Sequence, residues 1–207
     1  MLFTELPFLE RFAAARAGFE AVEFLFPMSM PPGKSDSACR RTSCSWCCSI
    51  PHPATSTPEN GARRHPGRSA EARRDIELAL EYACQLGCPQ VHIMAGVVPP
   101  GADRAACEAV LIGNLRYAAE CFARHDKRIL IEALNPQTKP GYLYHSQYQT
   151  LAMVKRVDRP NPAVQLDLFH AQKVDGNLSH LITEYAGQYR HIQIASRPTV
   201  MNRMRAK

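Results

Sequence analysis

Residues 128–133 read Arg-Ile-Leu-Ile-Glu-Ala, and residues 163–168 read Ala-Val-Gln-Leu-Asp-Leu. Each is a short, mostly apolar run of the kind that forms a buried strand in a parallel sheet. A helix is predicted between them, from about Ser146 to Val157. This strand, helix, strand unit indicates an α/β fold.

The same alternation extends in both directions along the chain. Further strands are predicted at 21–26, 90–95 and 191–195, and further helices at about 4–16, 69–87, 103–123 and 177–185. A repeated helix-then-strand pattern is typical of a barrel or a doubly wound sheet. Because no dinucleotide-binding or P-loop glycine pattern follows any predicted strand, the barrel is favoured. We predict one α/β domain over residues 1–207, a (β/α)8 TIM barrel.

The composition is that of an ordinary globular protein. Its 207 residues are 45% hydrophobic and 21% charged, which is enough apolar material for one core. No apolar run reaches the roughly 18 to 20 residues that span a bilayer, and Glu5, Glu10 and Arg11 do not fit a signal peptide. We therefore expect a cytoplasmic protein with no membrane partner, whose eight cysteines are reduced thiols.

The net charge of +6 is concentrated in two segments. Residues 28–74 hold eight Lys and Arg against three Asp and Glu, and residues 196–207 hold four basic residues and no acidic ones. The rest of the chain is mildly acidic. Since binding to nucleic-acid phosphates needs a basic surface, we expect no nucleic-acid partner, and the same argument counts against endonuclease action on abasic DNA.

Residues 28–66 interrupt the helix and strand rhythm. They hold six of the sixteen prolines, four of the eight cysteines and the one tryptophan. Cys44 and Cys47 have the spacing of a zinc knuckle, with His52 and His65 as candidate further ligands. One alternative is therefore a Cys- and Arg-rich protein that binds zinc or nucleic acid on an α/β scaffold, and another is a disordered insertion with free thiols.

A third interpretation, which we favour, is that residues 28–64 are translated in a shifted reading frame. Reading one base earlier turns every cysteine codon into a codon for Leu, Val or Met, so the cysteine cluster becomes an apolar run that restores the missing β/α unit. In the tail, 196–207, the same shift turns Met201-Asn202 into a glutamate codon. We expect residues 28–66 to be irregular and poorly packed in the chain as given.

Polar residues stand at the predicted carboxyl ends of three successive strands. Glu132 ends one strand, Asp167 and His170 follow the next, and Gln193 lies near the end of the last. All strand ends of a β/α barrel meet at one face, where active sites are built. Two carboxylates and neutral oxygen donors suit a hard divalent cation such as Mg²⁺ or Mn²⁺. We interpret His92, inside a strand, as a core histidine or one that supports the site.

Four stretches also match a known family pattern. The most specific, residues 167–178, reads Asp-Leu-Phe-His-Ala-Gln-Lys-Val-Asp-Gly-Asn-Leu, and residues 3–27, 92–96 and 131–134 add further matches. In these stretches the chain resembles the hydroxypyruvate isomerase family of xylose-isomerase-like TIM barrels, and within it the 2-oxo-tetronate isomerase branch. The resemblance covers about residues 1–27 and 65–195.

The resemblance implies a metal held by a Glu, an Asp, a Gln and a second Glu. By motif, Glu132, Asp167 and Gln193 match the first three ligands, Glu132 is also implied to be catalytic, and His170 matches a substrate-binding histidine. The second Glu belongs to a last strand that the chain does not reach, and a first strand ahead of Leu2 is absent as well. Since such barrels have about 250 residues, we expect an incomplete barrel.

The implied activity is that of an aldose-ketose type isomerase acting on a short hydroxy-keto acid. The carbonyl and the neighbouring hydroxyl exchange places through an enediolate that a divalent metal stabilises. The implied substrate pairs are 2-oxo-tetronate with 3-oxo-tetronate, or hydroxypyruvate with tartronate semialdehyde. With one carboxylate missing, we expect this chain to be impaired. The sequence gives no indication of an oligomeric state.

Overall fold

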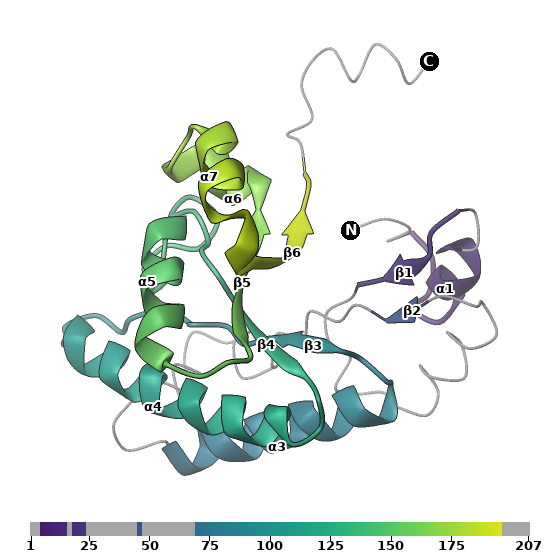
Figure 1. Cartoon of the computed structure of the whole chain (residues 1–207), viewed down its shortest axis with the longest axis horizontal. Coiled ribbons are helices and arrows are strands. Elements are labelled where there is room, and N and C mark those ends of the chain that lie inside the picture. The colour runs from purple at the N-terminus through teal and green to yellow at the C-terminus, as the bar shows by residue number, and fades with distance from the viewer. Residues whose placement is uncertain (1–4, 16–17, 24–44, 47–68, 196–207) are drawn as a thin grey trace.

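The structure is a computed structural model that describes residues 5–15, 18–23, 45–46 and 69–195 (Figure 1). The candidate zinc ligands Cys44, Cys47, His52 and His65 lie outside the described residues. The tail at 196–207 also lies outside the described residues, as does the segment 28–66 apart from Ser45 and Trp46. The expectations for these segments stay predictions, except that Ser45 and Trp46 form a short strand where an irregular segment was expected.

The strands form two parallel sheets. The larger one has the order β3 (Gln90–His92), β4 (Arg128–Glu132), β5 (Pro162–Asp167) and β6 (Tyr189–Gln193). The smaller one pairs β1 (Ala21–Val22) with β2 (Ser45–Trp46). Neighbours in space are neighbours in sequence, and all pairs are parallel. The predicted parallel α/β architecture is confirmed.

Helices precede or connect the strands along the chain. They are α1 (Glu10–Ala15), α3 (Ser69–Gln85), α4 (Arg104–Ala123), α5 (Gln147–Val157), α6 (Leu168–Val174), α7 (Leu178–Tyr185) and the 3₁₀ turn η3 (Ala186–Gln188). Figure 1 shows α3, α4 and α5 on one side of the sheet. In the described residues, no helix is both long enough and apolar enough to cross a membrane.

Local sequence signals account for several helix boundaries. Asp103 caps α4 by accepting a hydrogen bond from the Ala105 N–H (2.9 Å), and Ser146 forms a capping box with Gln149 at the start of α5. Gly87 follows α3 with a φ of +66°, a conformation that favours glycine. The predicted ends of these helices are therefore confirmed to within a few residues.

Several elements differ from the prediction, among them the last strand, which spans Tyr189–Gln193 rather than 191–195. The first helix begins at Glu10 rather than Thr4, because the chain first turns at Pro7, whose carbonyl accepts from the Glu10 N–H (2.9 Å). Strand β3 ends at His92 rather than Ala95. The sequence pattern does not predict helix α6, since this helix starts directly after β5 without an intervening loop.

Side chains alternate between the two faces of the larger sheet. The face under the helices is aliphatic: Val91, Ile129 and Ile131 belong to one buried cluster, and Val164 and Leu166 belong to another. The opposite face carries Glu132 and, beside it in register, Gln165. The helix-covered face is called the outer face below, and the other the inner face.

A register shift between Val164 and Gln165 of β5 sets which side of β6 faces inward. Val164 pairs with Tyr189, but Gln165 pairs with His191 and Asp167 with Gln193, so β6 has one extra residue there. Buried Tyr189 accordingly lies in the outer apolar cluster. The shift places the polar residues of β6 on the same face as Gln165 and Asp167.

Candidate metal and substrate site

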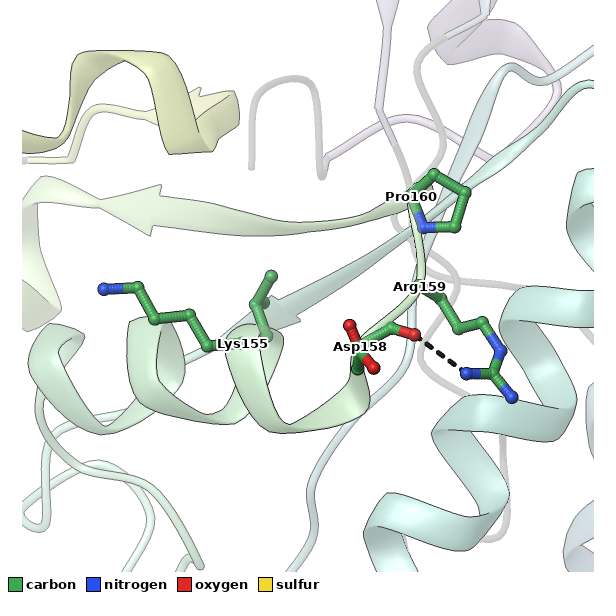
Figure 2. Close-up of a pocket in the computed structure, with 5 residues that line it drawn as sticks. Lys155, Asp158, Arg159 and Pro160 are labelled. Carbon is green, nitrogen blue, oxygen red and sulfur yellow. Dashed lines mark hydrogen bonds between the residues drawn. The ribbon is translucent and has the colours of Figure 1, made fainter.

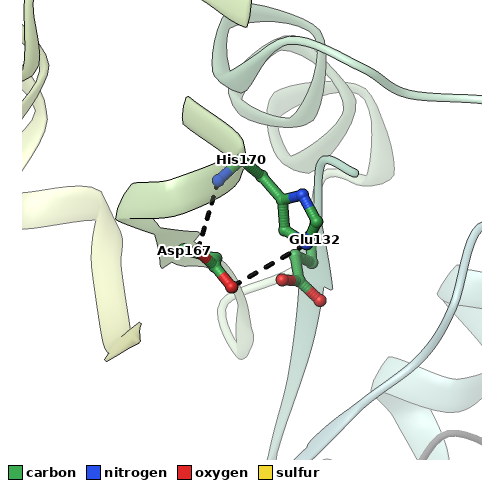
Figure 3. A group of neighbouring side chains, drawn as sticks. All are labelled: Glu132, Asp167 and His170. Atoms are coloured by element: carbon green, nitrogen blue, oxygen red, sulfur yellow. Dashed lines mark hydrogen bonds and ion pairs between the residues drawn. The ribbon is translucent and has the colours of Figure 1, made fainter. Parts of the chain in front are cut away.

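Three of the four predicted site residues form a compact cluster at the carboxyl ends of β4 and β5. Glu132, Asp167 and His170 can each offer one ligand atom such that all three atoms lie within 4.8 Å of one another (Figure 3). Glu132 ends β4, Asp167 ends β5, and His170 lies in the first turn of α6. The parallel sheet brings these ends to one edge, as strand ends do in a barrel.

Glu132 is the most buried carboxylate of the cluster, with 6% of its surface exposed. Burial, and after it the nearby charge of Asp167, raise the pKa of Glu132 to about 8, while a hydrogen bond from Gln165 opposes this rise. His92 contacts it from β3, with 3.4 Å between Nδ1 and Oε2. His92 is 3% exposed and borders the site.

Asp167 has a structural role besides its place in the cluster. Its Oδ1 accepts hydrogen bonds from the backbone N–H groups of Phe169 (2.7 Å) and His170 (3.3 Å), so it is the N-cap of α6. Its Oδ2 faces His170, 3.8 Å from Nε2. The cap explains why a helix begins immediately after β5, and why His170 turns back toward Asp167.

Hydrogen bonds fix the orientation of the His170 ring. Nδ1 of His170 lies 2.7 Å from the side-chain Nδ2 of Asn135 and 3.2 Å from the backbone nitrogen of the same residue. The Asn135 oxygen accepts from the Thr138 N–H (2.9 Å) and hydroxyl (3.1 Å), which leaves Nδ2 as the donor. Nδ1 therefore accepts, and the neutral ring carries its proton on Nε2, toward the cluster. Burial lowers the pKa of His170, which favours this neutral form, although Asp167 opposes the shift.

Gln193, the fourth predicted residue, lies one strand away. It is the register partner of Asp167, and its Oε1 accepts a hydrogen bond from Gln165 Nε2 (2.9 Å). Gln165 also donates to Glu132, so it joins the two candidate ligands. The amide nitrogen of Gln193 donates to Glu23 Oε1 (2.6 Å).

Sequence reasoning did not single out Asn135, Gln165 or Glu23. Gln165 lies two residues before Asp167 on the same strand face, so strand periodicity could have identified it. Asn135 lies in the loop after β4, and its contact with His170 spans 35 residues. Glu23 lies 170 residues from Gln193, and no local signal links the two.

The donor set fits a divalent cation of the hard, oxygen-preferring kind. Two carboxylates converge in a buried place, where burial and then their mutual repulsion raise the pKa of Glu132, and a cation between them would offset both costs. The Oε1 atom of Gln165 is also buried with no hydrogen-bond partner. The tautomer of His170 does not fit a ligand through Nε2, because a metal needs that nitrogen deprotonated.

A pocket at the other end of the sheet does not share this chemistry. Figure 2 shows it before β5, lined by Val154, Lys155, Asp158, Arg159 and Pro160. Arg159 donates to the backbone oxygen of Asp158 there (2.8 Å). Since β5 runs away from this pocket toward Asp167, it lies at the amino end of the strands, where barrel active sites are not built.

Comparisons with known proteins agree with this geometry. A family model described as a xylose isomerase-like TIM barrel matches residues 12–205. The chain is 50% identical over 200 residues to 2-oxo-tetronate isomerase of Pectobacterium atrosepticum, covering 96% of this chain and 76% of that protein. It is 40% identical over 205 residues to a putative hydroxypyruvate isomerase of Mus musculus, covering 95% and 74%. A crystal structure described as AP endonuclease, family 2, from Brucella melitensis superimposes with a TM-score of 0.89 and 42% identity, covering 95% of this chain and 76% of that one.

Proposed function

The chain belongs to the xylose isomerase-like TIM barrel family, and from that premise we propose that it is a metal-dependent isomerase of short hydroxy-keto acids. Its relatives named as isomerases make it a sugar-acid isomerase by family resemblance. The observation that carries the metal-dependent mechanism is the convergence of Glu132, Asp167 and His170 at the carboxyl edge of the sheet.

Glu132, Asp167 and Gln193 are the residues that would hold the cation. Mg²⁺ or Mn²⁺ suits this set, because both prefer carboxylate and amide oxygens. When bound, the cation supplies Lewis-acid polarisation of the substrate oxygens and stabilises the negative charge that develops on them. The assignments of these three side chains are supported by their shared face and register.

Glu132 is the proposed acid–base residue. Isomerisation requires a group that removes the proton from one carbon and returns it to the neighbouring carbon. Burial and the charge of Asp167 bring the pKa of Glu132 to about 8, and a carboxyl poised near neutral pH can both accept and donate. A cation at the site would lower this pKa, so that the carboxyl is deprotonated at neutral pH and can accept the proton.

His170 is the proposed substrate-binding residue. With Nδ1 accepting from Asn135, the Nε2–H is free to donate to a substrate oxygen. This N–H group would orient the bound hydroxy-keto acid. It would also stabilise the negative charge that develops on the substrate oxygen when the proton moves between the two substrate carbons. The names of the relatives point to 2-oxo-tetronate or hydroxypyruvate as the small-molecule partner.

The test is an isomerase assay in which Mn²⁺ is removed with chelator and added back. We expect 2-oxo-tetronate or hydroxypyruvate to be interconverted with its isomer only when Mn²⁺ or Mg²⁺ is present. Glu132→Gln should lower kcat by at least about 10² to 10⁴, the usual contribution of general acid–base catalysis. Glu184→Gln, on exposed helix α7, is the matched control. Full activity in chelator, or in Glu132→Gln, would contradict the proposal.

The impairment of this chain is part of the same proposal. A companion chain, in which residues 28–64 and 196–207 are restored to the neighbouring reading frame, should be the more active of the two. Resequencing the DNA around codons 27, 64 and 196 tests the frame directly. If the DNA in that frame does not encode an apolar run in the first segment and a glutamate motif in the tail, the frame-shift hypothesis is wrong.

The Brucella melitensis structure is described as an AP endonuclease, which makes DNA cleavage the second candidate. The charge distribution does not favour it: outside residues 28–74 and 196–207, the chain has 13 Lys and Arg against 16 Asp and Glu. A surface with this balance repels phosphate. We expect no cleavage of a duplex that contains an abasic site.

A further inference from the structure

Glu23 reaches across the molecule to the candidate site. It directly follows β1, yet its carboxylate contacts β6: Oε1 lies 2.6 Å from Gln193 Nε2, and Oε2 lies 2.9 Å from His191 Nε2. Both carboxylate oxygens are thus used, and the Glu23 side chain is 28% exposed. Helix-forming or strand-pairing requirements do not explain these contacts, because Glu23 lies outside β1.

These contacts form a directional chain of hydrogen bonds. A glutamate carboxylate only accepts hydrogen bonds, so the group that Gln193 turns toward Glu23 must be its NH₂. The oxygen of Gln193 is then forced to the opposite side, where it accepts from Gln165 (2.9 Å). Gln165 in turn donates to Glu132. Glu23 therefore decides that the oxygen of Gln193, and not its nitrogen, faces Gln165 and, through it, Glu132.

We propose that Glu23 is a positioning residue, which orients the Gln193 amide so that its oxygen is presented to a divalent cation. The inference rests on the proposed function, because it takes Gln193 as a ligand. If the amide were reversed, its NH₂ hydrogens would point at the cation and repel it. Residues that orient a metal ligand typically contribute 10- to 100-fold to metal affinity.

Two substitutions that exchange the charge test this orientation role. Glu23→Gln leaves an amide that can offer either an oxygen or an NH₂ to Gln193, so both orientations of Gln193 become allowed. Gln193→Glu removes the need for orientation, because both ends of a carboxylate are oxygens, but it sets two carboxylates against each other. In the double variant the amide introduced at position 23 donates to the carboxylate introduced at position 193, and an oxygen faces the site again.

The readout is the dissociation constant for Mn²⁺, measured on the full chain by electron paramagnetic resonance, without any substrate. We expect Glu23→Gln to weaken Mn²⁺ binding by about 10-fold or more and the double variant to restore it. Glu20→Gln removes the same charge from an exposed position three residues earlier and should bind as the parent does. Gln193→Glu alone carries the same new carboxylate as the double variant, so tighter Mn²⁺ binding by the double variant than by Gln193→Glu would not follow from the added charge or from a merely structural role of Glu23.

The inference is overturned if Glu23→Gln binds Mn²⁺ within about twofold of the parent, or if the double variant stays as weak as Glu23→Gln. In both cases the parent still binds Mn²⁺, so the proposed function survives. If the parent itself binds no Mn²⁺, both the inference and the metal-dependent mechanism are wrong. The results for the parent and for Glu23→Gln therefore separate the two failures.

Discussion

The two faces of the larger sheet are built by the same strands but have opposite chemistry. On the outer face, Ile129, Ile131 and Val164 are fully buried beneath helices. On the inner face, burial and the proximity of Asp167 together raise the pKa of Glu132. The outer face lowers the free energy of the fold through apolar burial, whereas the inner face raises it by holding two carboxylates together away from water.

This difference indicates where stability and function can be separated. An outer-face substitution should change the free energy of unfolding and leave the chemistry of the folded protein intact. An inner-face substitution should do the reverse, because removing a repulsive charge does not cost stability. Substitutions on the two faces therefore test this division.

Among the substitutions that test this division, the largest effect is expected for Asp167→Asn. Asparagine caps a helix about as well as aspartate does, so α6 should remain, but a candidate ligand charge is lost. We expect kcat/KM to fall at least about a hundredfold, the upper range for residues that merely support a metal ligand, with a change in unfolding free energy below about 1 kcal/mol. Activity assays and urea unfolding measure the two quantities. Asp103→Asn, at the cap of α4, should leave both unchanged; a large loss of stability in Asp167→Asn would contradict the division.

The outer face should respond in the opposite way to Ile131→Ala. Ile131 is 0% exposed in the main core, and truncating a buried isoleucine costs about 2 to 5 kcal/mol of unfolding free energy. The activity per folded molecule should stay the same. Ile192→Ala is the matched control, because Ile192 lies in β6 but is 51% exposed, and it should cost far less. Equal losses for the two variants would refute the assignment of the core.

The buried carboxylates of the inner face predict a pH dependence for the metal-free protein. The pKa of Glu132 is about 8 in the folded chain against an ordinary value of 4.5. Between these pH values the folded chain holds a proton that the unfolded chain has lost, so the unfolding free energy falls as the pH rises from about 4.5 to about 8. The loss should reach a few kcal/mol, since each pKa unit is worth about 1.4 kcal/mol. Chemical denaturation in chelator at several pH values should show it, and Glu132→Gln should flatten the slope.

A smaller effect is expected when the His170 tautomer is changed by Asn135→Asp. A carboxylate beside Nδ1 favours a proton there and raises the pKa of His170, which removes the preference for the Nε2–H tautomer that we propose as a substrate donor. We expect kcat/KM to fall about 10-fold, roughly the value of one hydrogen bond to a charged group. The ¹⁵N chemical shifts of the imidazole should report the change, with Asn177→Asp as control. Unchanged shifts with unchanged activity would show that Asn135 does not set the tautomer.

The smallest effect belongs to the helix surface above the outer face. Arg159 bonds Glu120 (2.8 Å), and both side chains are well exposed. Exposed ion pairs contribute about 0 to 1 kcal/mol, so Arg159→Ala should shift the unfolding free energy by less than about 1 kcal/mol and leave catalysis unchanged. A larger loss in urea unfolding would show that this pair contributes to the packing of α4 against β5.

Features that depend on local spacing could be predicted from the amino-acid order alone. The apolar runs at 128–133 and 163–168 and the helix between them follow from the periodicity of the side chains, which the backbone geometry enforces. That Glu132 and Asp167 lie together follows too, because parallel strands place their carboxyl ends at one edge. The motif at 167–178 indicated the family, which the comparisons confirm.

Contacts between distant segments became visible only in the folded molecule. The extra residue in β6 determines that His191 and Gln193 face inward, and no local propensity specifies a register shift between two strands. The orientation of His170 depends on Asn135, and that of Gln193 depends on Glu23, in each case through a hydrogen bond between segments far apart in the chain. Such pairs form only after the strands have packed, because the positions of both partners are set by the whole sheet rather than by their neighbours in sequence.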